Sequence, residues 1–69
     1  MSRNFILSKN IKSIRKRKGM SQDRLCKLAE VTHTTLAKIE SGVNENPTIR
    51  TLQKIANALD VRIDDLLKG

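Results

Sequence analysis

Aromatic residues are almost missing from this chain: among its 69 residues there is one phenylalanine, and there is no tyrosine or tryptophan. Proteins that bind single-stranded nucleic acid, and the sheet-based readers of RNA, stack bases on aromatic side chains. A chain that offers only Phe5 for stacking is therefore a poor candidate for either class.

Cysteine and histidine are equally scarce, with one residue of each. A single cysteine cannot form an internal disulfide, and Cys26 together with His33 cannot supply the four ligands of a structural zinc site. The same scarcity leaves no plausible set of acid, base and nucleophile for catalysis. The sequence therefore predicts neither an enzyme nor a metal or cofactor site.

Long hydrophobic runs are absent as well. The longest apolar run has three residues, from Phe5 to Leu7. A membrane-spanning helix needs roughly 20 such residues, and a signal peptide needs an apolar stretch of about 7–15. We therefore expect a soluble cytoplasmic protein that makes no contact with a membrane.

What the sequence has in excess is positive charge, with 14 Lys and Arg residues against 7 Asp and Glu and a net charge of +7. Residues 1–38 carry ten basic and two acidic side chains, whereas residues 39–69 carry four basic and five acidic ones. A charge run is often only a solvated helix face. An excess confined to one half of a small domain instead favours a surface that faces a polyanion.

Hydrophobic residues recur three and four positions apart along the whole chain, which predicts helices and no strands. The first helix is expected over residues 6–18, ending before Gly19. Two short helices are expected over residues 22–29 and 33–41, each preceded by a Ser or Thr that is suited to cap it.

A loop that ends at Pro47 separates these helices from a fourth one, which begins after Thr48 as its N-cap. A last short helical turn follows and contains Ile63, Leu66 and Leu67. The expected fold is all-α, with five short helices in one compact domain over residues 1–69.

The two short helices and the brief turn between them match the helix-turn-helix pattern. In the second of them, Leu36 and Ile39 point toward the core at helical spacing. An ordinary solvated face would more often carry Glu and Lys pairs than the small polar set found on the opposite side. The residues that project that way are His33, Thr34, Ala37 and Lys38.

The spacing of hydrophobic, capping and turn residues is typical of one protein family in two segments, IKSIRKRKGMSQDRLCKLAEVTHTTLAKIESG and NPTIRTLQKIANALDV. Over residues 11–67 the chain resembles the Cro/C1-type (XRE-like) helix-turn-helix family of phage and bacterial transcriptional regulators. The resemblance implies a lambda-repressor-like domain with the helix-turn-helix in its second and third helices. It also implies a nucleoid-associated homodimer, in phage or prokaryote, that reads a pseudo-palindromic operator in the major groove of double-stranded DNA.

The family's base-reading positions fall on His33, Thr34 and Lys38. Lys38 suits guanine, Thr34 can hydrogen-bond or touch a thymine methyl, and His33 has both donor and acceptor states, which leaves its base open. A second capping role is the alternative for His33. The expected phosphate contacts come from the resemblance at Gln22, Ser41 and Asn44, from helical projection at Thr35, and from charge at Lys9, Lys12, Arg17 and Lys18. For Thr35 a contact within its own helix is the alternative.

The resemblance implies that Arg15 and Glu40 form a partly buried ion pair that orients the recognition helix. Several positions depart from the family pattern, among them Glu30, Cys26, Arg24, Glu45 and Arg62. Glu30 stands in the turn where the family usually has glycine, and Cys26 stands where it wants a small residue, so we expect Cys26 to be a packing residue. Ser41 and Asn44 have turn formation as their alternative role.

Members of this family commonly dimerise through the loop before the fourth helix and through the C-terminal region. The candidates are Ile49, Val61, Ile63 and Leu67, and core burial is the alternative for each.

A protein-interaction module on the same fold, such as an antitoxin that acts through a protein partner, is the second hypothesis for the function. A basic helix on a membrane surface is the third. The first hypothesis, a DNA-binding transcriptional regulator, includes phage repressors and restriction-modification controllers.

Overall fold

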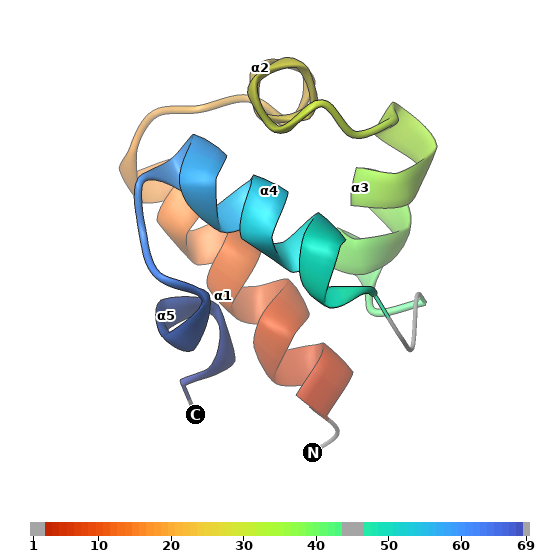
Figure 1. Cartoon of the computed structure of the whole chain (residues 1–69), viewed down its shortest axis with the longest axis vertical. Helices are drawn as coiled ribbons and strands as arrows, with labels where there is room; N and C mark the ends of the chain where they lie inside the picture. The colour runs from red at the N-terminus through yellow and green to blue at the C-terminus, as the bar shows by residue number, and fades with distance from the viewer. Residues whose placement is uncertain (1–2, 44–46, 69) are drawn as a thin grey trace.

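A computed structural model describes residues 3–43 and 47–68 of the chain. Within those ranges the protein is all-α, as the sequence predicts, and it contains five helices (Figure 1). The helices are α1 (Arg3–Arg17), α2 (Gln22–Ala29), α3 (His33–Ser41), α4 (Ile49–Leu59) and α5 (Ile63–Leu67).

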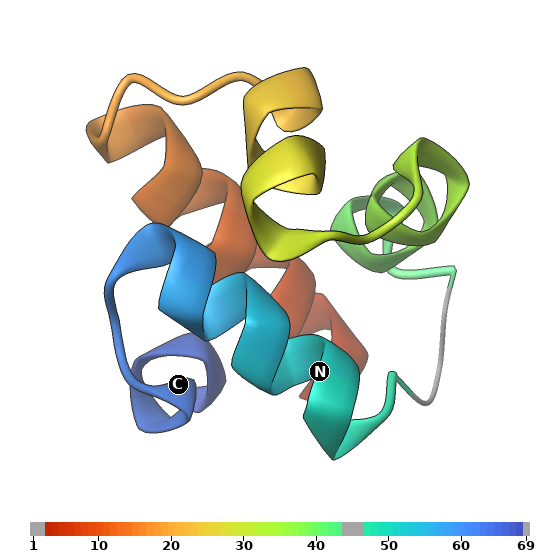
Figure 2. The same cartoon turned by 45° about the horizontal axis from the view of Figure 1, so that its top comes forward.

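The helix α1 is the longest and organises the others. It packs against α3 on one side and against α5 on another, while α2 packs against both α3 and α4. Figure 1 shows α4 lying across α1, with α2 at one end of the molecule and α5 near the other. Figure 2 brings α2 and α3 forward and shows that only a short turn joins them.

The core is built from one apolar face of each helix. On α4 this face is Leu52, Ile55, Ala56 and Leu59, which follow the 3–4 spacing that places side chains on one side of a helix. Burying each large aliphatic side chain contributes about 1.5–3 kcal/mol relative to leaving it exposed. The remaining core residues are Leu7, Ile11, Ile14, Leu25, Cys26, Ala29, Leu36, Ile39 and Leu66.

Helix starts follow the expected capping pattern. The side-chain oxygens of Ser21, Thr32 and Thr48 each accept a hydrogen bond, at 3.1 Å, from the backbone N–H three residues later. Each bond satisfies one of the donors that a helix start leaves without an intrahelical partner. The predicted starts of α2, α3 and α4 are therefore confirmed.

The predicted start of the first helix, at about residue 6, is wrong by three residues, because α1 begins at Arg3. The prediction relied on hydrophobic spacing, and among residues 6–17, whose burial the structure describes, Leu7 is the first buried residue of α1. A single turn is too short to set a hydrophobic period, so spacing alone does not locate where the helix begins.

The short helix α5 is held onto α1 by polar contacts. The side-chain amide of Asn10 donates to the carbonyl of Leu66 at 2.9 Å and to that of Lys68 at 2.7 Å. At the start of α5, the backbone N–H of Arg62 donates to Asp65 Oδ2 at 3.0 Å. This bond, with a smaller contribution from Lys68, holds the pKa of Asp65 below its ordinary value.

None of the helices described over residues 3–43 and 47–68 is both long enough and apolar enough to cross a membrane.

Candidate nucleic-acid interface

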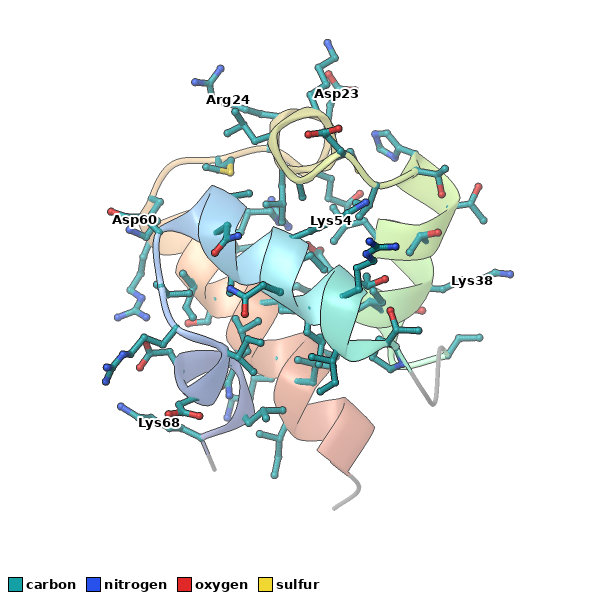
Figure 3. The ribbon with its side chains drawn as sticks, in the orientation of Figure 1. Asp23, Arg24, Lys38, Lys54, Asp60 and Lys68 are labelled. Atoms are coloured by element: carbon teal, nitrogen blue, oxygen red, sulfur yellow. The ribbon has the colours of Figure 1, made fainter. Side chains whose placement is uncertain are left out.

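The outer face of α3 carries the three residues expected to read bases. Leu36 and Ile39 are buried against the core, which turns the opposite side of the helix toward solvent. His33, Thr34 and Lys38 are all exposed on that side. Figure 3 shows Lys38 extending away from the body of the molecule. The structure therefore gathers these three side chains on one accessible helix face.

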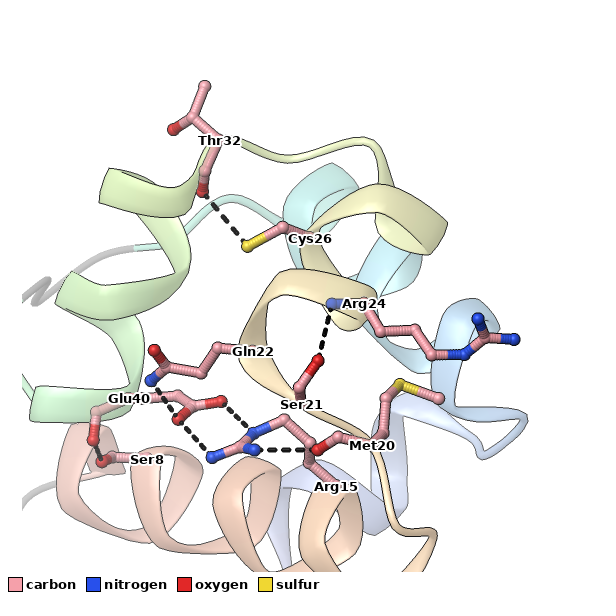
Figure 4. Close-up of polar contacts among 9 residues, drawn as sticks. All are labelled: Ser8, Arg15, Met20, Ser21, Gln22, Arg24, Cys26, Thr32 and Glu40. Carbon is pink, nitrogen blue, oxygen red and sulfur yellow. Dashed lines mark hydrogen bonds and ion pairs between the residues drawn. The ribbon is translucent and has the colours of Figure 1, made fainter.

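The orientation of α3 is set by a buried ion pair between Arg15 on α1 and Glu40 on α3. Arg15 Nε lies 2.8 Å from Glu40 Oε2, and Arg15 Nη2 donates to Glu40 Oε1 at 3.1 Å. The exposed fractions are 9% for Arg15 and 3% for Glu40. Arg15 Nη1 also donates to the carbonyl of Met20, so the pair ties together α1, α3 and the segment that leads into α2 (Figure 4).

Two further bonds converge on Glu40. The side-chain amide of Gln22, at the start of α2, donates to Glu40 Oε1 at 2.8 Å. The hydroxyl of Ser8 on α1 donates to the backbone carbonyl of Glu40 (Figure 4). Because α1 and α2 both bond to this one residue of α3, they fix how α3 sits in the domain. Gln22, expected to contact phosphate, is half-buried and directs its amide nitrogen inward.

The other expected phosphate contacts on α3 also have local partners. Thr35 is half-buried at the helix start, where it accepts a hydrogen bond from the Thr32 hydroxyl at 2.8 Å. Ser41 is exposed, and its hydroxyl donates to the carbonyl of Lys38 at 3.1 Å. Both hydroxyls keep acceptor capacity, as every hydroxyl has two lone pairs. Asn44 lies outside the described residues.

Exposed basic side chains lie along α1 and on the residue after it. The expected contacts Lys12, Arg17 and Lys18 are all exposed. An open hollow on α1 is lined by Ser8, Lys9, Lys12, Ser13 and Lys16. Since Ser8 also donates a hydrogen bond to Glu40 on α3, this hollow borders α3. Lys16 was not among the expected contacts, although its spacing from Lys9 and Lys12 is that of one helix face.

A contact across the helix pair joins Asp23, in the first turn of α2, to His33 at the start of α3. Asp23 Oδ1 lies 3.6 Å from His33 Nε2, and Asp23 Oδ2 lies 3.2 Å from Lys27 Nζ. Figure 3 labels Asp23 at the outer end of the molecule. The sequence does not predict this contact, because no local pattern shows which residue of the next helix Asp23 meets.

Two of the departures from the family pattern, Cys26 and Glu30, lie in the helix pair α2–α3. Cys26 is buried where α2 crosses α3, and its thiol donates to the carbonyl of Thr32 at 3.9 Å. Burial, helped by the negative charges of Asp23 and Glu40, raises the pKa of this thiol above its ordinary value. Glu30 ends α2 with φ of 56° and ψ of 44°, the left-handed conformation that glycine usually adopts.

The four candidates for a dimer contact divide into two groups. Ile49, at the start of α4, is 70% exposed, and Leu67 on α5 is 47% exposed. Val61 and Ile63 are half-buried and pack against the core, which was their alternative role. Val43 was not a candidate, yet it is 67% exposed and precedes the loop that leads to α4.

No group of three or more His, Cys, Asp or Glu side chains that could hold a metal ion occurs in the part of the chain that the structure describes.

Comparison with known proteins identifies relatives of this chain. Residues 11–66 match a family model described as "Helix-turn-helix". SinR, an HTH-type transcriptional regulator of Bacillus subtilis, is 37% identical over 62 residues, which cover 90% of this chain and 56% of SinR. SlrR, another HTH-type transcriptional regulator of B. subtilis, is 36% identical over 61 residues, which cover 88% of this chain and 40% of SlrR. The chain thus spans about half the length of these relatives.

Solved structures have the same fold. The N-terminal DNA-binding domain of B. subtilis SinR superposes with a TM-score of 0.88 at 35% identity, and the match covers 94% of each chain. The restriction-modification controller protein C.Esp1396I superposes with a TM-score of 0.83 at 30% identity, over 100% of this chain and 97% of that one. Both likenesses extend over nearly the whole five-helix domain.

Proposed function

Because this chain belongs to the helix-turn-helix family of transcriptional regulators, we propose that residues 1–69 form a single domain that binds double-stranded DNA sequence-specifically and regulates transcription. A regulator of this kind acts by binding, which agrees with the expectation that the chain is not an enzyme. The observation that carries the proposal is the exposed outer face of α3, backed by the buried pair of Arg15 and Glu40.

In this proposal α3 enters the major groove and His33, Thr34 and Lys38 meet base edges. An α-helix fits the major groove, and the ammonium group of Lys38 can donate to guanine O6 and N7. The buried anchor at Glu40 supports this role, since a recognition helix must hold its side chains in one orientation to discriminate between bases.

The phosphate backbone would be met by the start of α2 and by the basic side of α1. A helix N-terminus offers unpaired backbone N–H groups and a positive dipole end to an anion, and α2 begins at Gln22. The lysines that line the hollow on α1 add a positive field beside the helix pair. These contacts carry affinity for any sequence, whereas the outer face of α3 carries the choice of sequence.

We infer that the DNA-bound form is a homodimer. The half-sites of a pseudo-palindrome lie about 34–36 Å apart, one helical turn. The longest dimension of this domain is 28 Å, and each chain has a single α3, so two copies are needed to read both half-sites. The exposed side chains of Ile49 and Leu67 are the proposed contact residues, whereas Val61 and Ile63 are half-buried and pack against the core.

Selection from a pool of randomised DNA duplexes tests the proposal. The protein is expected to enrich one pseudo-palindromic sequence at moderate salt, because two identical α3 helices would read two inverted half-sites. A pool that shows no enrichment would instead favour the second hypothesis, a protein-interaction module on the same fold. The Ile49→Ser variant is a check on the dimer: it should weaken enrichment of the two-half-site sequence while the domain stays folded.

A further inference from the structure

Asp23 is an unusual residue for a DNA-facing surface. Residues 1–38 contain ten basic and two acidic side chains, and Asp23 is one of those two. It lies in the first turn of α2, beside the helix start that we propose meets phosphate. A carboxylate at that place weakens the attraction of the surface for any duplex, whatever its sequence.

The structure shows what this carboxylate faces. Asp23 Oδ1 lies 3.6 Å from Nε2 of His33 on the next helix, while Asp23 Oδ2 lies 3.2 Å from Lys27 Nζ on its own helix. The side chains of Asp23 and His33 are 61% and 57% exposed, so they meet at the outer surface of the helix pair rather than inside it. The contact therefore joins α2 to one of the three proposed base-reading side chains.

We propose that Asp23 is a positioning residue for base recognition, which holds the imidazole of His33 with its Nε2–H toward the carboxylate. This inference rests on the proposed function. At 3.6 Å the contact is electrostatic rather than a hydrogen bond. A negative oxygen still favours a proton over a lone pair on the nitrogen that faces it, so in the neutral ring Nδ1 is left as an acceptor.

This arrangement predicts the class of base that His33 reads. In the major groove, adenine presents its N6 amino group and cytosine its N4 amino group as donors, whereas guanine and thymine present acceptors at the corresponding positions. An acceptor at Nδ1 matches the first two bases and not the last two. The sequence left the preference of His33 open, and the contact with Asp23 decides it in favour of an adenine or cytosine edge.

The variant Asp23→Asn separates positioning of His33 from simple electrostatics, because it should raise the affinity for any duplex and lower the base preference. Loss of the negative charge should tighten binding to a scrambled duplex. At the same time, the preference for adenine or cytosine at one position of each half-site should fall about fivefold, the size of one net hydrogen bond. Both quantities come from selection on randomised duplexes, followed by titration of the selected and scrambled sequences with the full chain.

Two controls show whether a change in base preference arises through His33 or through the loss of charge alone. Asp64→Asn removes the same charge from an exposed site on α5, far from the α2–α3 pair in Figure 1, and should leave base preference unchanged. In a double-mutant cycle, Asp23→Asn introduced into a His33→Ala background should no longer change base preference, since the side chain it positions is gone. It should still tighten binding to scrambled DNA in that background.

Three results would overturn the inference. Asp23→Asn could keep the wild-type base preference, it could weaken selected and scrambled duplexes alike, or it could act independently of His33 in the cycle. The second of these would make Asp23 a purely structural residue. Failure of the proposed function looks different, because then the wild-type chain itself would enrich no duplex, and the inference about base reading would fall with it.

Discussion

At the scale of single residues, Lys38 and Lys12 have the same chemistry and different expected roles. Both are exposed, but Lys38 lies on the outer face of α3 and Lys12 lies on α1. Lys38→Ala should cost about 1–3 kcal/mol at the base pair it reads and relax the preference there. Lys12→Ala should weaken all sequences nearly equally and reduce the salt slope by about 1.

Each of these two variants is the control for the other, because both remove one exposed ammonium group. Binding to the selected duplex and to single-base variants of it, measured over a range of salt concentrations, gives both quantities. Equal losses from the two variants on every sequence would contradict the assignment of base reading to α3.

A second prediction at this scale concerns Cys26. Its thiol is buried, and burial raises its pKa, so the reactive thiolate is scarcer than in an exposed cysteine. Iodoacetamide should therefore alkylate Cys26 in the folded protein roughly tenfold or more slowly than in the urea-unfolded chain. Mass spectrometry of timed samples at one alkaline pH measures both rates, and equal rates would mean that the thiol is not buried.

At the scale of the helices, the ion pair between Arg15 and Glu40 connects α3 to the rest of the domain. Glu40→Ala would leave the Arg15 guanidinium buried without its partner, and it should lower the free energy of unfolding by about 3–5 kcal/mol. Urea unfolding at 25 °C measures the loss. Glu40→Gln keeps the shape and part of the hydrogen bonding, and we expect an intermediate loss.

The matched control for Glu40 is Glu30→Ala, which also removes a glutamate but from an exposed position. That change should stay within about 0.5 kcal/mol of the wild type, because alanine and glutamate both carry a Cβ and bear the same cost of the left-handed backbone. If Glu40→Ala and Glu30→Ala are equally mild, the pair does not hold α3 in place.

The end of α2 gives a prediction of opposite sign. Glu30 adopts a left-handed conformation with φ of 56°, which costs a side-chain-bearing residue about 1–2 kcal/mol and costs glycine little. Glu30→Gly should therefore raise the free energy of unfolding by about 1 kcal/mol, after the larger backbone entropy of glycine in the unfolded chain is subtracted.

Asp60 ends α4 with a φ of 57° and provides the comparison. Aspartate visits the left-handed region more readily than glutamate, so Asp60→Gly should give a smaller gain than Glu30→Gly. Urea unfolding of both variants tests this order. A loss of stability in Glu30→Gly would mean that contacts of the glutamate side chain outweigh the backbone strain.

Local sequence signals account for most of the elements. Ser21, Thr32 and Thr48 are caps whose bonding depends on residues only three positions away, so the helix starts after them could be predicted. The first turn of α1 could not, because one turn is too short to set a hydrophobic period. The outward set on α3 followed from a helical projection, since the 3.6-residue period fixes which side chains share a face.

At the scale of the whole molecule, the contacts that could not be predicted from local pattern are those that join distant helices. The bond from Gln22 to Glu40, the contact of Asp23 with His33, and the bonds from Asn10 to the end of α5 each join residues on different helices. Their existence depends on how the helices cross, and no spacing rule within one segment specifies that. The pair of Arg15 and Glu40 was expected only from family resemblance.

The charge distribution can also be assigned to particular helices at this scale. The basic excess of residues 1–38 belongs to α1, α2 and the first part of α3, whereas the exposed side chains of Ile49 and Leu67 belong to α4 and α5. One domain would thus present a recognition face in its first half and support and dimer contacts in its second. In the proposed function, charge would provide attraction to any duplex, and α3 would provide discrimination.

The most direct test of this account is a titration of the full chain with the duplex that selection yields and with a scrambled duplex of equal length and composition, at one moderate salt concentration. We expect a Kd of roughly 10⁻⁸ M or tighter for the selected duplex and binding about a thousandfold weaker for the scrambled one. Equal affinity for the two duplexes would contradict the claim that the exposed face of α3 reads sequence.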